Sequence, residues 1–354
     1  LRRCAPRPSA HCAKRPAQRR VCFDVVRNCG ATLLKTQGDN MNEFGELKKV
    51  NIREVWNTED MHFTPWLAKN IEKLGEVLGI ELELIEKEAE VGDFSLDILA
   101  KDIGRNKNVI IENQFGNTDH KHLGQLLTYA AGYDAGAIIW IAEELREEHR
   151  RTIDWLNESV NEEIEFYGVV IEILKIDNSK PAYNFKLVAF PNKWSKSTYK
   201  SSTISSKAES YRSFFQLLID TLRTKYKFTE ASKGQPQSWY SFTSGVKGIL
   251  YSASFALGSR VRAEIYIDKG DKDVNEKIFD ELFQQKEYIE NKFGQHFEWE
   301  KLEDKRACRV AIYRQGNIDC DEDLKNEILT WCIENLLKIK EVFILDQKIK
   351  SILK

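Results

Sequence analysis

Six consecutive apolar residues, Ala137 to Ala142, constrain the fold more than any other segment of the chain. A short apolar run of this kind is typical of a strand that is buried on both faces. Helical patterns lie on either side of it: Thr118-Asp119 predicts a helix start, and a charged helix is expected over 146–157. The strand therefore belongs in a sheet that helices flank.

The same alternation extends over residues 61–178. Thr64-Pro65 predicts the start of a helix that ends at Gly79, and Gly104 to Asn108 predicts the turn of a hairpin. The expected elements are helices at 64–79, from 118 and at 146–157, and strands at 80–85, 94–100, 109–115, 137–142 and 165–176. This order predicts an α/β fold with a mixed sheet flanked by helices.

Residues 179–210 lose hydrophobic periodicity and are rich in Ser, Lys and Thr, which predicts a linker. In the unit that follows, helices are expected at 211–226, 274–293 and 324–338, and strands at 249–257, 260–267, 297–303 and 306–313. Trp239 and Tyr240 are expected in a loop. The predicted organisation is a first domain at 41–178, a basic linker at 179–210 and an α+β domain at 211–354.

The first 40 residues differ in charge from the rest of the chain. They carry nine Lys or Arg against two Asp, whereas residues 41–354 carry 44 against 53. They show neither an apolar period nor the apolar stretch of a secretory signal. We expect residues 1–40 to be a non-native or disordered extension, with the native start at Met41.

Composition excludes one class of protein and indicates a compartment. No stretch approaches the roughly 18–20 consecutive apolar residues of a membrane helix, so no membrane span is expected. The scattered Cys308, Cys320 and Cys332 suit the reducing cytoplasm. We expect them to lie in the core as small apolar residues.

Asp97 on the second strand and Glu112 and Gln114 on the third are the candidate catalytic residues. Alternation places Glu112 and Gln114 on one face of their strand, and the hairpin brings the end of that strand beside Asp97. Converging carboxylates are the ligands that a hard divalent cation prefers, so we predict a site for Mg²⁺, which Mn²⁺ can replace. The alternative is that both acids are solvated strand residues.

This arrangement resembles the PD-(D/E)XK nuclease superfamily, in which an Asp and, later, a (Glu/Asp)-x-Lys occupy such strand positions. Asp97 matches the motif Asp and Glu112 the motif acid, while Gln114 stands where the Lys usually stands. The resemblance covers roughly residues 61–178. It implies a restriction-endonuclease-like fold in which Asp97 and Glu112 ligate the metal and Gln114 takes part in catalysis.

A helix after the third strand adds to the resemblance. Gln125 and Tyr129 match the Gln-x-x-x-Tyr signature of the RecB-like branch, and His122, Gln125 and Tyr129 share one stripe of the helix. The resemblance implies that this helix packs beside the metal site. Glu72 resembles the accessory acid of some family members. An ordinary solvated helix surface is the alternative for Glu72, Gln125 and Tyr129.

The neutral Gln114 leaves the role of the usual lysine open. Lys101 shares a strand face with Asp97, and Lys121 lies near the start of the next helix. We expect one of these two lysines to supply the positive charge beside the nucleophile.

Residues 193–212 suggest a surface for nucleic acid. Five Lys or Arg stand there against a single Glu, with Trp194, Tyr199 and Tyr211 interleaved. The residues predicted to contact nucleic acid are Lys121, Lys193, Lys196 and Lys200. The alternative is a linker that is merely well solvated.

The C-terminal unit carries a second resemblance. Its segments 238–242, 298–300 and 304–306 resemble an uncharacterised bacterial domain that commonly follows such nuclease-like units. This resemblance implies an architecture but no activity.

Together these patterns favour a cytoplasmic, metal-dependent nuclease that hydrolyses phosphodiester bonds, with DNA as the preferred nucleic acid and bacterial defence or restriction as a role the family suggests. A non-catalytic nucleic-acid-binding module that retains the fold is the alternative, because Gln114 replaces the lysine. A structural subunit that recruits a partner enzyme is a third interpretation. A homodimer is plausible where two strands must be cut.

Overall fold

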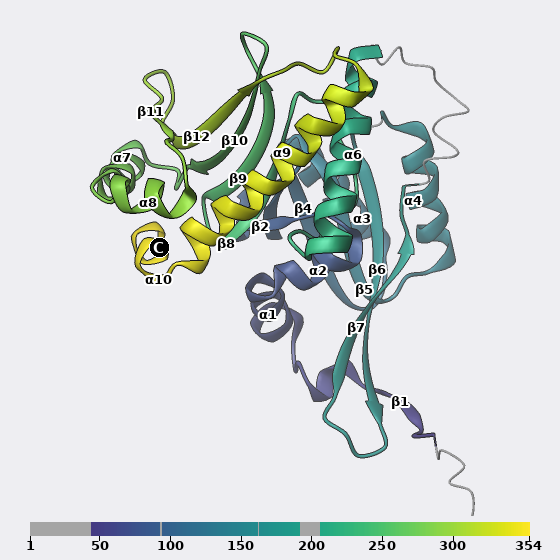
Figure 1. Ribbon diagram of the computed structural model, residues 1–354. Coiled ribbons are helices and arrows are strands. Elements are labelled where there is room, and N and C mark those ends of the chain that lie inside the picture. Colours follow the sequence, from purple (N-terminus) through teal and green to yellow (C-terminus); the bar gives the residue numbers. More distant parts are fainter. Residues whose placement is uncertain (1–43, 93, 162, 192–205) are drawn as a thin grey trace, which may run out of the picture. The chain divides into compact units, whose positions relative to one another are not determined.

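The structure is a computed structural model that describes residues 44–92, 94–161, 163–191 and 206–354. Residues Glu46–Lys354 form one compact unit. Within the described residues this unit contains two sheets (Figure 1). No described helix is both long and apolar enough to cross a bilayer.

The first sheet combines parallel and antiparallel strands. Its strands are β1 (Leu47–Val50), β2 (Leu82–Val91), β3 (Phe94–Asp102), β4 (Lys107–Asn117), β5 (Ala135–Glu144), β6 (Glu165–Ile176) and β7 (Ala182–Ala189). The strand order is β1-β6-β5-β4-β3-β2, and β7 also pairs with β6. Strands β4, β5 and β6 are parallel to one another, whereas the other pairs are antiparallel.

Helices cover both faces of this sheet. They are η1 (Ile52–Glu54), η2 (Glu59–Phe63), α1 (Thr64–Lys69), α2 (Ile71–Leu78), α3 (His120–Gly132) and α4 (Glu147–Ser159). Apolar residues of η2, α1 and α2 pack with Ile98, Ile111 and Ile139 on one face. Apolar residues of α3 and α4 pack with Leu99, Ile110 and Ile138 on the other.

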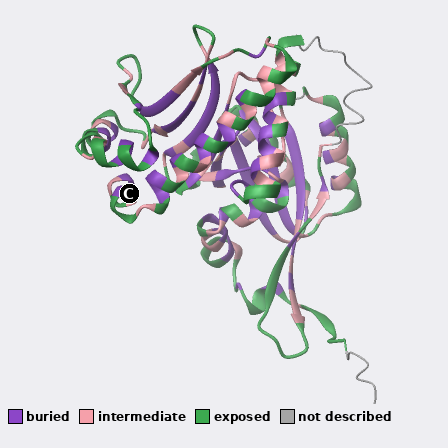
Figure 2. Ribbon diagram, in the orientation of Figure 1, coloured by how far each residue is buried: buried purple, intermediate pink, exposed green. Residues whose placement is uncertain are grey.

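The apolar run Ala137–Ala142 lies in β5, between β4 and β6, and all six of its residues are buried (Figure 2). This burial confirms the interpretation of that run as a strand covered on both faces. The turn between β3 and β4 confirms the expected hairpin, with Asn106 at a positive φ of 55°. At the start of α3, the Asp119 side chain accepts a hydrogen bond from the His122 N–H, as a helix cap does.

The second sheet is antiparallel, in the order β11-β12-β10-β9-β8. Its strands are β8 (Trp239–Val246), β9 (Ile249–Ala256), β10 (Arg260–Ile267), β11 (Glu298–Lys301) and β12 (Cys308–Gln315). The helices around it are α6 (Ser206–Tyr226), α7 (Lys272–Phe283), α8 (Lys286–Phe293), α9 (Glu322–Lys340), η3 (Glu341–Leu345) and α10 (Gln347–Leu353). Helices α6 and α9 lie side by side, and both contribute to one apolar core with the strands (Figure 1).

These elements confirm the predicted fold class, a mixed sheet flanked by helices followed by a second α+β part. Of the cysteines, Cys308 and Cys332 are buried in the second core as expected, and Cys320 packs partly against it.

Four local predictions were wrong. The helix expected at 64–79 is interrupted at Asn70 and divided into α1 and α2. The stretch 179–210 was expected to be a linker, but Ala182–Ala189 forms β7, an edge strand whose pairing with β6 compensates for its weak apolar pattern. Trp239 and Tyr240 were expected in a loop, but they are the first two residues of β8, because pairing with β9 holds them extended. The helix expected at 274–293 is divided at Gln284 and Gln285 into α7 and α8.

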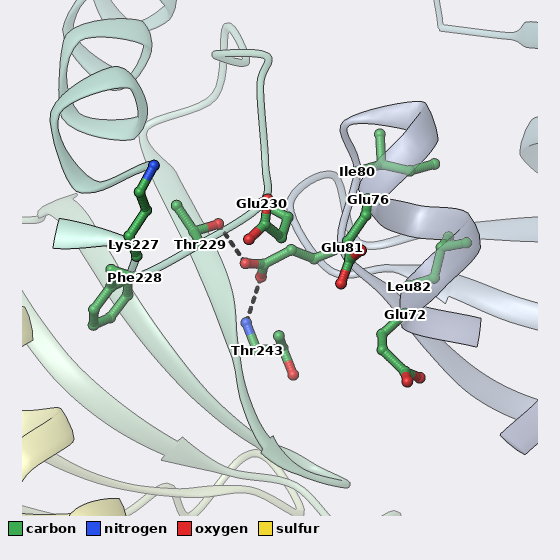
Figure 3. Close-up of a pocket in the computed structure, with 10 residues that line it drawn as sticks. All are labelled: Glu72, Glu76, Ile80, Glu81, Leu82, Lys227, Phe228, Thr229, Glu230 and Thr243. Carbon is green, nitrogen blue, oxygen red and sulfur yellow. Dashed lines mark hydrogen bonds between the residues drawn. The ribbon is translucent and has the colours of Figure 1, made fainter. Parts of the chain in front are cut away.

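The two sheets meet around Glu81, which directly precedes β2. Its carboxylate accepts hydrogen bonds from the Thr229 hydroxyl and from the backbone N–H of Thr243 in β8 (Figure 3). Nearby, the Gly79 carbonyl accepts hydrogen bonds from the backbone N–H and the hydroxyl of Ser232, at 3.0 and 2.9 Å. The contact between the two sheets is therefore polar and hydrogen-bonded as well as apolar.

Candidate functional site

Strand register brings the two predicted metal ligands together. Ile98 of β3 pairs with Ile111 of β4, so Asp97 lies across from Glu112 at the next position of the ladder. The backbone N–H of Asn113 donates a hydrogen bond of 2.7 Å to Asp97 Oδ2. The Asn113 side chain points to the other face, where it donates to the Thr64 hydroxyl at 2.8 Å. The backbone of β4 therefore holds the Asp97 carboxylate in position.

A third carboxylate, Glu59, joins this pair. Glu59 begins the π-helical turn η2, and it accepts a hydrogen bond from the backbone N–H of Phe115 in β4. It interacts electrostatically with both Asp97 and Glu112. The sequence interpretation missed Glu59, because no spacing rule links this turn to β3. The only local signal is an acidic pair, Glu59-Asp60, just before the predicted helix start.

Burial and repulsion raise the pKa values of all three acids. Burial and, next in size, the nearby charge of Asp97 raise the pKa of Glu112 to about 9. Burial likewise raises the pKa of Asp97 to about 6, although the Asn113 N–H opposes this shift. Burial, followed by the charge of Asp97, raises the pKa of Glu59 to about 7. Full ionisation of the three acids is therefore unfavourable, because their surroundings do not neutralise that much negative charge.

The amide of Gln114 is oriented by its own hydrogen bonds. Its Nε2 donates to the Asn117 carbonyl at 3.0 Å and to Asp119 Oδ2 at 2.8 Å. Among the described residues, Gln114 Oε1 and Glu112 Oε2 are buried and have no hydrogen-bond partner. Buried polar atoms without partners are uncommon, and both of these oxygens can accept from or ligate a further group.

Helix α3 borders the cluster. His122 Nδ1 contacts Asp119 Oδ1 at 2.9 Å, and this histidine lies close enough to Asp97 to lower its pKa. Gln125 Nε2 donates to the Tyr129 hydroxyl at 3.1 Å, which in turn donates to the Ser95 carbonyl at 3.1 Å. The ring of Tyr129 belongs to the core.

Lys121, exposed on the first turn of α3, is near enough to Glu112 to lower its pKa. The structure thus brings His122, Gln125, Tyr129 and Lys121 to the neighbourhood of Asp97 and Glu112.

Two predicted site residues lie elsewhere. Lys101 is four residues beyond Asp97, or about 13 Å along the strand, and it lines a different cavity, bordered by the second sheet. Glu72 is exposed on α2 and lines the small cavity around Glu81 (Figure 3). For Lys101 the shared strand face was not sufficient, because the distance along β3 separates it from Asp97. Lys193, Lys196 and Lys200 lie outside the described residues.

The donor set suits a hard divalent cation, because it consists of carboxylate and amide oxygens and two of these oxygens have no partner. No group of three or more His, Cys, Asp or Glu side chains among the described residues is arranged to hold a metal ion by itself. Mg²⁺ usually takes only one or two carboxylates and keeps several waters. The residues present fit that kind of site.

A domain of unknown function (DUF4268) matches residues 210–345, the second sheet and most of its helices. No curated protein matches the chain.

Two solved structures show partial likeness to the chain. A repair endonuclease from Pyrococcus abyssi is 17% identical over 25% of this chain and 41% of its own, with a TM-score of 0.22. SfsA from Pyrococcus furiosus, in complex with Ca²⁺, is 15% identical over 35% of this chain and 60% of its own, with a TM-score of 0.23. The match spans less than two thirds of either protein, and likenesses this partial carry no functional conclusion.

Proposed function

We propose that this chain is a metal-dependent nuclease that hydrolyses phosphodiester bonds in DNA, with Mg²⁺ as its metal and Mn²⁺ as a substitute. One observation carries the proposal: half-buried Asp97 lies across from buried Glu112 in an acidic cluster, and Glu112 Oε2 has no partner among the described residues. An ionised cluster of this kind is costly unless a cation neutralises it.

Asp97 and Glu112 would hold the metal. A bound Mg²⁺ supplies charge neutralisation for a phosphodiester and a lowered pKa for a bound water. Gln114 Oε1 is an unpartnered acceptor whose amide is held in place, because Nε2 donates to Asn117 and Asp119. This oxygen would accept a proton of the attacking water and so orient it.

Lys121 takes the place of the absent motif lysine in this proposal. It is the lysine whose charge acts on Glu112, and its exposed position on α3 leaves it free to meet a phosphate. His122, Gln125 and Tyr129 belong to α3, the helix that borders the acids. In this proposal the phosphodiester would lie against that helix.

A non-catalytic nucleic-acid-binding module is the second candidate, and the neutral Gln114 is the observation that favours it. In such a module the acidic cluster would bind metal and DNA without turnover.

The deciding experiment incubates the full chain with plasmid and linear DNA in Mg²⁺, Mn²⁺ or EDTA. The Asp97→Ala/Glu112→Ala variant is assayed beside Glu148→Ala, which removes an exposed acid of α4. Metal-dependent cutting that the double variant loses and Glu148→Ala keeps would support the nuclease. Cutting that survives in the double variant, with its thermal melting intact, would refute it. DNA retardation without cutting would favour the binding module.

A further inference from the structure

The second sheet has one polar face that is nonetheless buried. Along β8, β9 and β10, alternate residues point into the apolar core with α6 and α9. The residues between them point to the opposite face, where Ser241, Ser252 and Ser254 are all buried. In an antiparallel sheet the polar face is normally exposed to water, and the face that other elements cover is normally apolar. A buried polar face therefore calls for an explanation.

This face lines a cavity of about 980 Å³. Residues of β2 and β3, Glu83 and Lys101 among them, form part of its wall. Small-molecule sites typically have volumes of roughly 300–1,000 Å³. The cavity is therefore large enough for a ligand of nucleotide size.

The lining is strongly basic. Eight of the lining residues are Lys or Arg, and three are Asp or Glu. Arg262 and Arg309 share the carboxylate of Glu264, at 3.0 and 3.1 Å, and Arg306 pairs with Asp268 at 2.7 Å. Glu264 and Asp268 are thus occupied by the arginines. The third acid, Glu83, lies across from Lys101 in the strand ladder and interacts electrostatically with Lys269.

The lysines of the lining are not compensated in this way. Lys101, Lys269 and Lys305 have no ion-pair partner among the described residues, and Lys247 reaches only the Ile85 carbonyl at 3.5 Å. An excess of positive charge in a concave site favours an anionic ligand.

Several residues of the lining carry buried polar atoms without a hydrogen-bond partner among the described residues. Ser254 is 4% exposed, and its hydroxyl has no hydrogen-bond partner among the described residues. The Nε–H groups of Arg262 and Arg309 also lack a well-aligned hydrogen bond, although both lie at ion-pair distance from Glu264. Hydroxyl and guanidinium donors together suit phosphate oxygens.

One aromatic side chain completes the lining. Trp239 is half-buried at the start of β8, directly across from Ser254, and it packs against no other aromatic ring among the described residues. A free indole face beside phosphate donors suits the stacking of a nucleobase.

We propose that this cavity is a nucleotide-binding site, in which the lysines and Ser254 bind phosphate and Trp239 stacks on the base. The ligand is either a free nucleotide or the nucleotide at an end of a single strand, because both present the same chemistry. The site is separate from the acidic cluster and needs no metal. Its test therefore succeeds or fails independently of nuclease activity.

The experiment measures binding to the full chain in EDTA, which prevents metal-dependent cutting. The probes are a fluorescent ATP analogue and a short fluorescein-labelled single-stranded oligodeoxynucleotide. Lys269→Glu reverses a charge of the lining, and Trp239→Ala removes the stacking ring. The matched control is Lys277→Glu, which reverses an exposed charge on α7 that is not part of the cavity.

We expect Lys269→Glu and Trp239→Ala each to weaken binding by about tenfold, because each removes a charge-assisted or stacking contact. Lys277→Glu is expected to bind like the unaltered chain. Displacement of both probes by ATP would support a free nucleotide. Displacement of the oligonucleotide by unlabelled strand but not by ATP would support a strand end.

Three results would overturn the proposal. The first is that neither probe binds. The second is that Lys269→Glu and Lys277→Glu bind the probes equally well. The third is that tripolyphosphate displaces the probes as effectively as ATP does. The last result would show that the base makes no contact. Thermal melting of each variant distinguishes a lost contact from a lost fold.

Discussion

Two buried glutamates, Glu81 directly before β2 and Glu112 in β4, differ in what surrounds their oxygens. Glu81 is 6% exposed and Glu112 is 4% exposed, and burial raises the pKa of Glu81 to about 7 and that of Glu112 to about 9. Glu81 accepts hydrogen bonds from Thr229 and Thr243, whereas Glu112 Oε2 has no partner among the described residues. Burial alone therefore does not distinguish the two acids; the unpartnered oxygen of Glu112 and its position in a group of acids do.

The two residues also have different neighbours. The charge of Asp97 is the second largest cause of the raised pKa of Glu112, whereas hydrogen bonds that lower the pKa follow burial at Glu81. Glu81 connects two sheets, while Glu112 stands in a cluster that remains electrostatically strained. We expect mutations at the two sites to act on stability with opposite signs.

The largest effect is expected for Glu112→Gln. If Glu112 ligates the metal, its loss should lower the rate of DNA cutting by about 10³-fold or more. Because the pKa of Glu112 is raised in the folded state, the folded chain keeps a proton that the unfolded chain releases. The free energy of unfolding therefore falls as pH rises from 4.5 towards about 9.

Glu112→Gln cannot ionise, so its free energy of unfolding should decline less over that pH range. Urea unfolding of both proteins at several pH values provides the measurement. If Glu112→Gln were less stable than the unaltered chain above neutral pH, the expectation that changes at Glu112 and Glu81 act on stability with opposite signs would be wrong.

The next effect is expected for Glu81→Ala. The change leaves the Thr243 N–H and the Thr229 hydroxyl without their acceptor, which should lower the free energy of unfolding by about 2–3 kcal/mol below neutral pH. The control is Glu230→Ala, which removes an exposed acid from the wall of the same small cavity (Figure 3). Equal urea midpoints for the two variants would show that Glu81 contributes nothing to the junction.

The effect of Mg²⁺ on stability is also expected to differ between variants at Glu81 and at Glu112. Binding to the folded chain alone, at about a hundredfold excess over the dissociation constant, should raise the free energy of unfolding by about 2.7 kcal/mol. Thermal melting with Mg²⁺ or EDTA measures this effect. Glu81→Ala should respond as the unaltered chain does, and Glu112→Gln should respond little. An undiminished response in Glu112→Gln would remove Glu112 from the metal site.

The smallest effect is expected for Lys121→Ala. Its charge lies near Glu112 but is exposed, so its loss should reduce cutting by about fivefold at most. Lys69→Ala, which removes an exposed lysine of α1, is the control. Equal rates for the two variants would exclude Lys121 as the substitute for the motif lysine.

Local sequence patterns predicted those relations in the site that depend on residues close together in the chain. The turn between β3 and β4 fixes their register, and the register places Asp97 across from Glu112. Alternation along β4 puts Gln114 on the face of Glu112, where its amide reaches the cap residue Asp119. These relations follow from periods of two along a strand and from turn chemistry, so they can be derived without the fold.

The sequence by itself determined the mixed sheet, its hairpin, the buried strand β5 and the pairing of Asp97 with Glu112. Only the tertiary structure decided that Glu59 joins these acids, that Lys101 lines another cavity, and that Glu81 meets Thr229, which is 148 residues away. The physical reason is that local periodicity fixes the direction of a side chain within its element. The partner it meets depends on how distant elements pack, and packing is settled by the whole core.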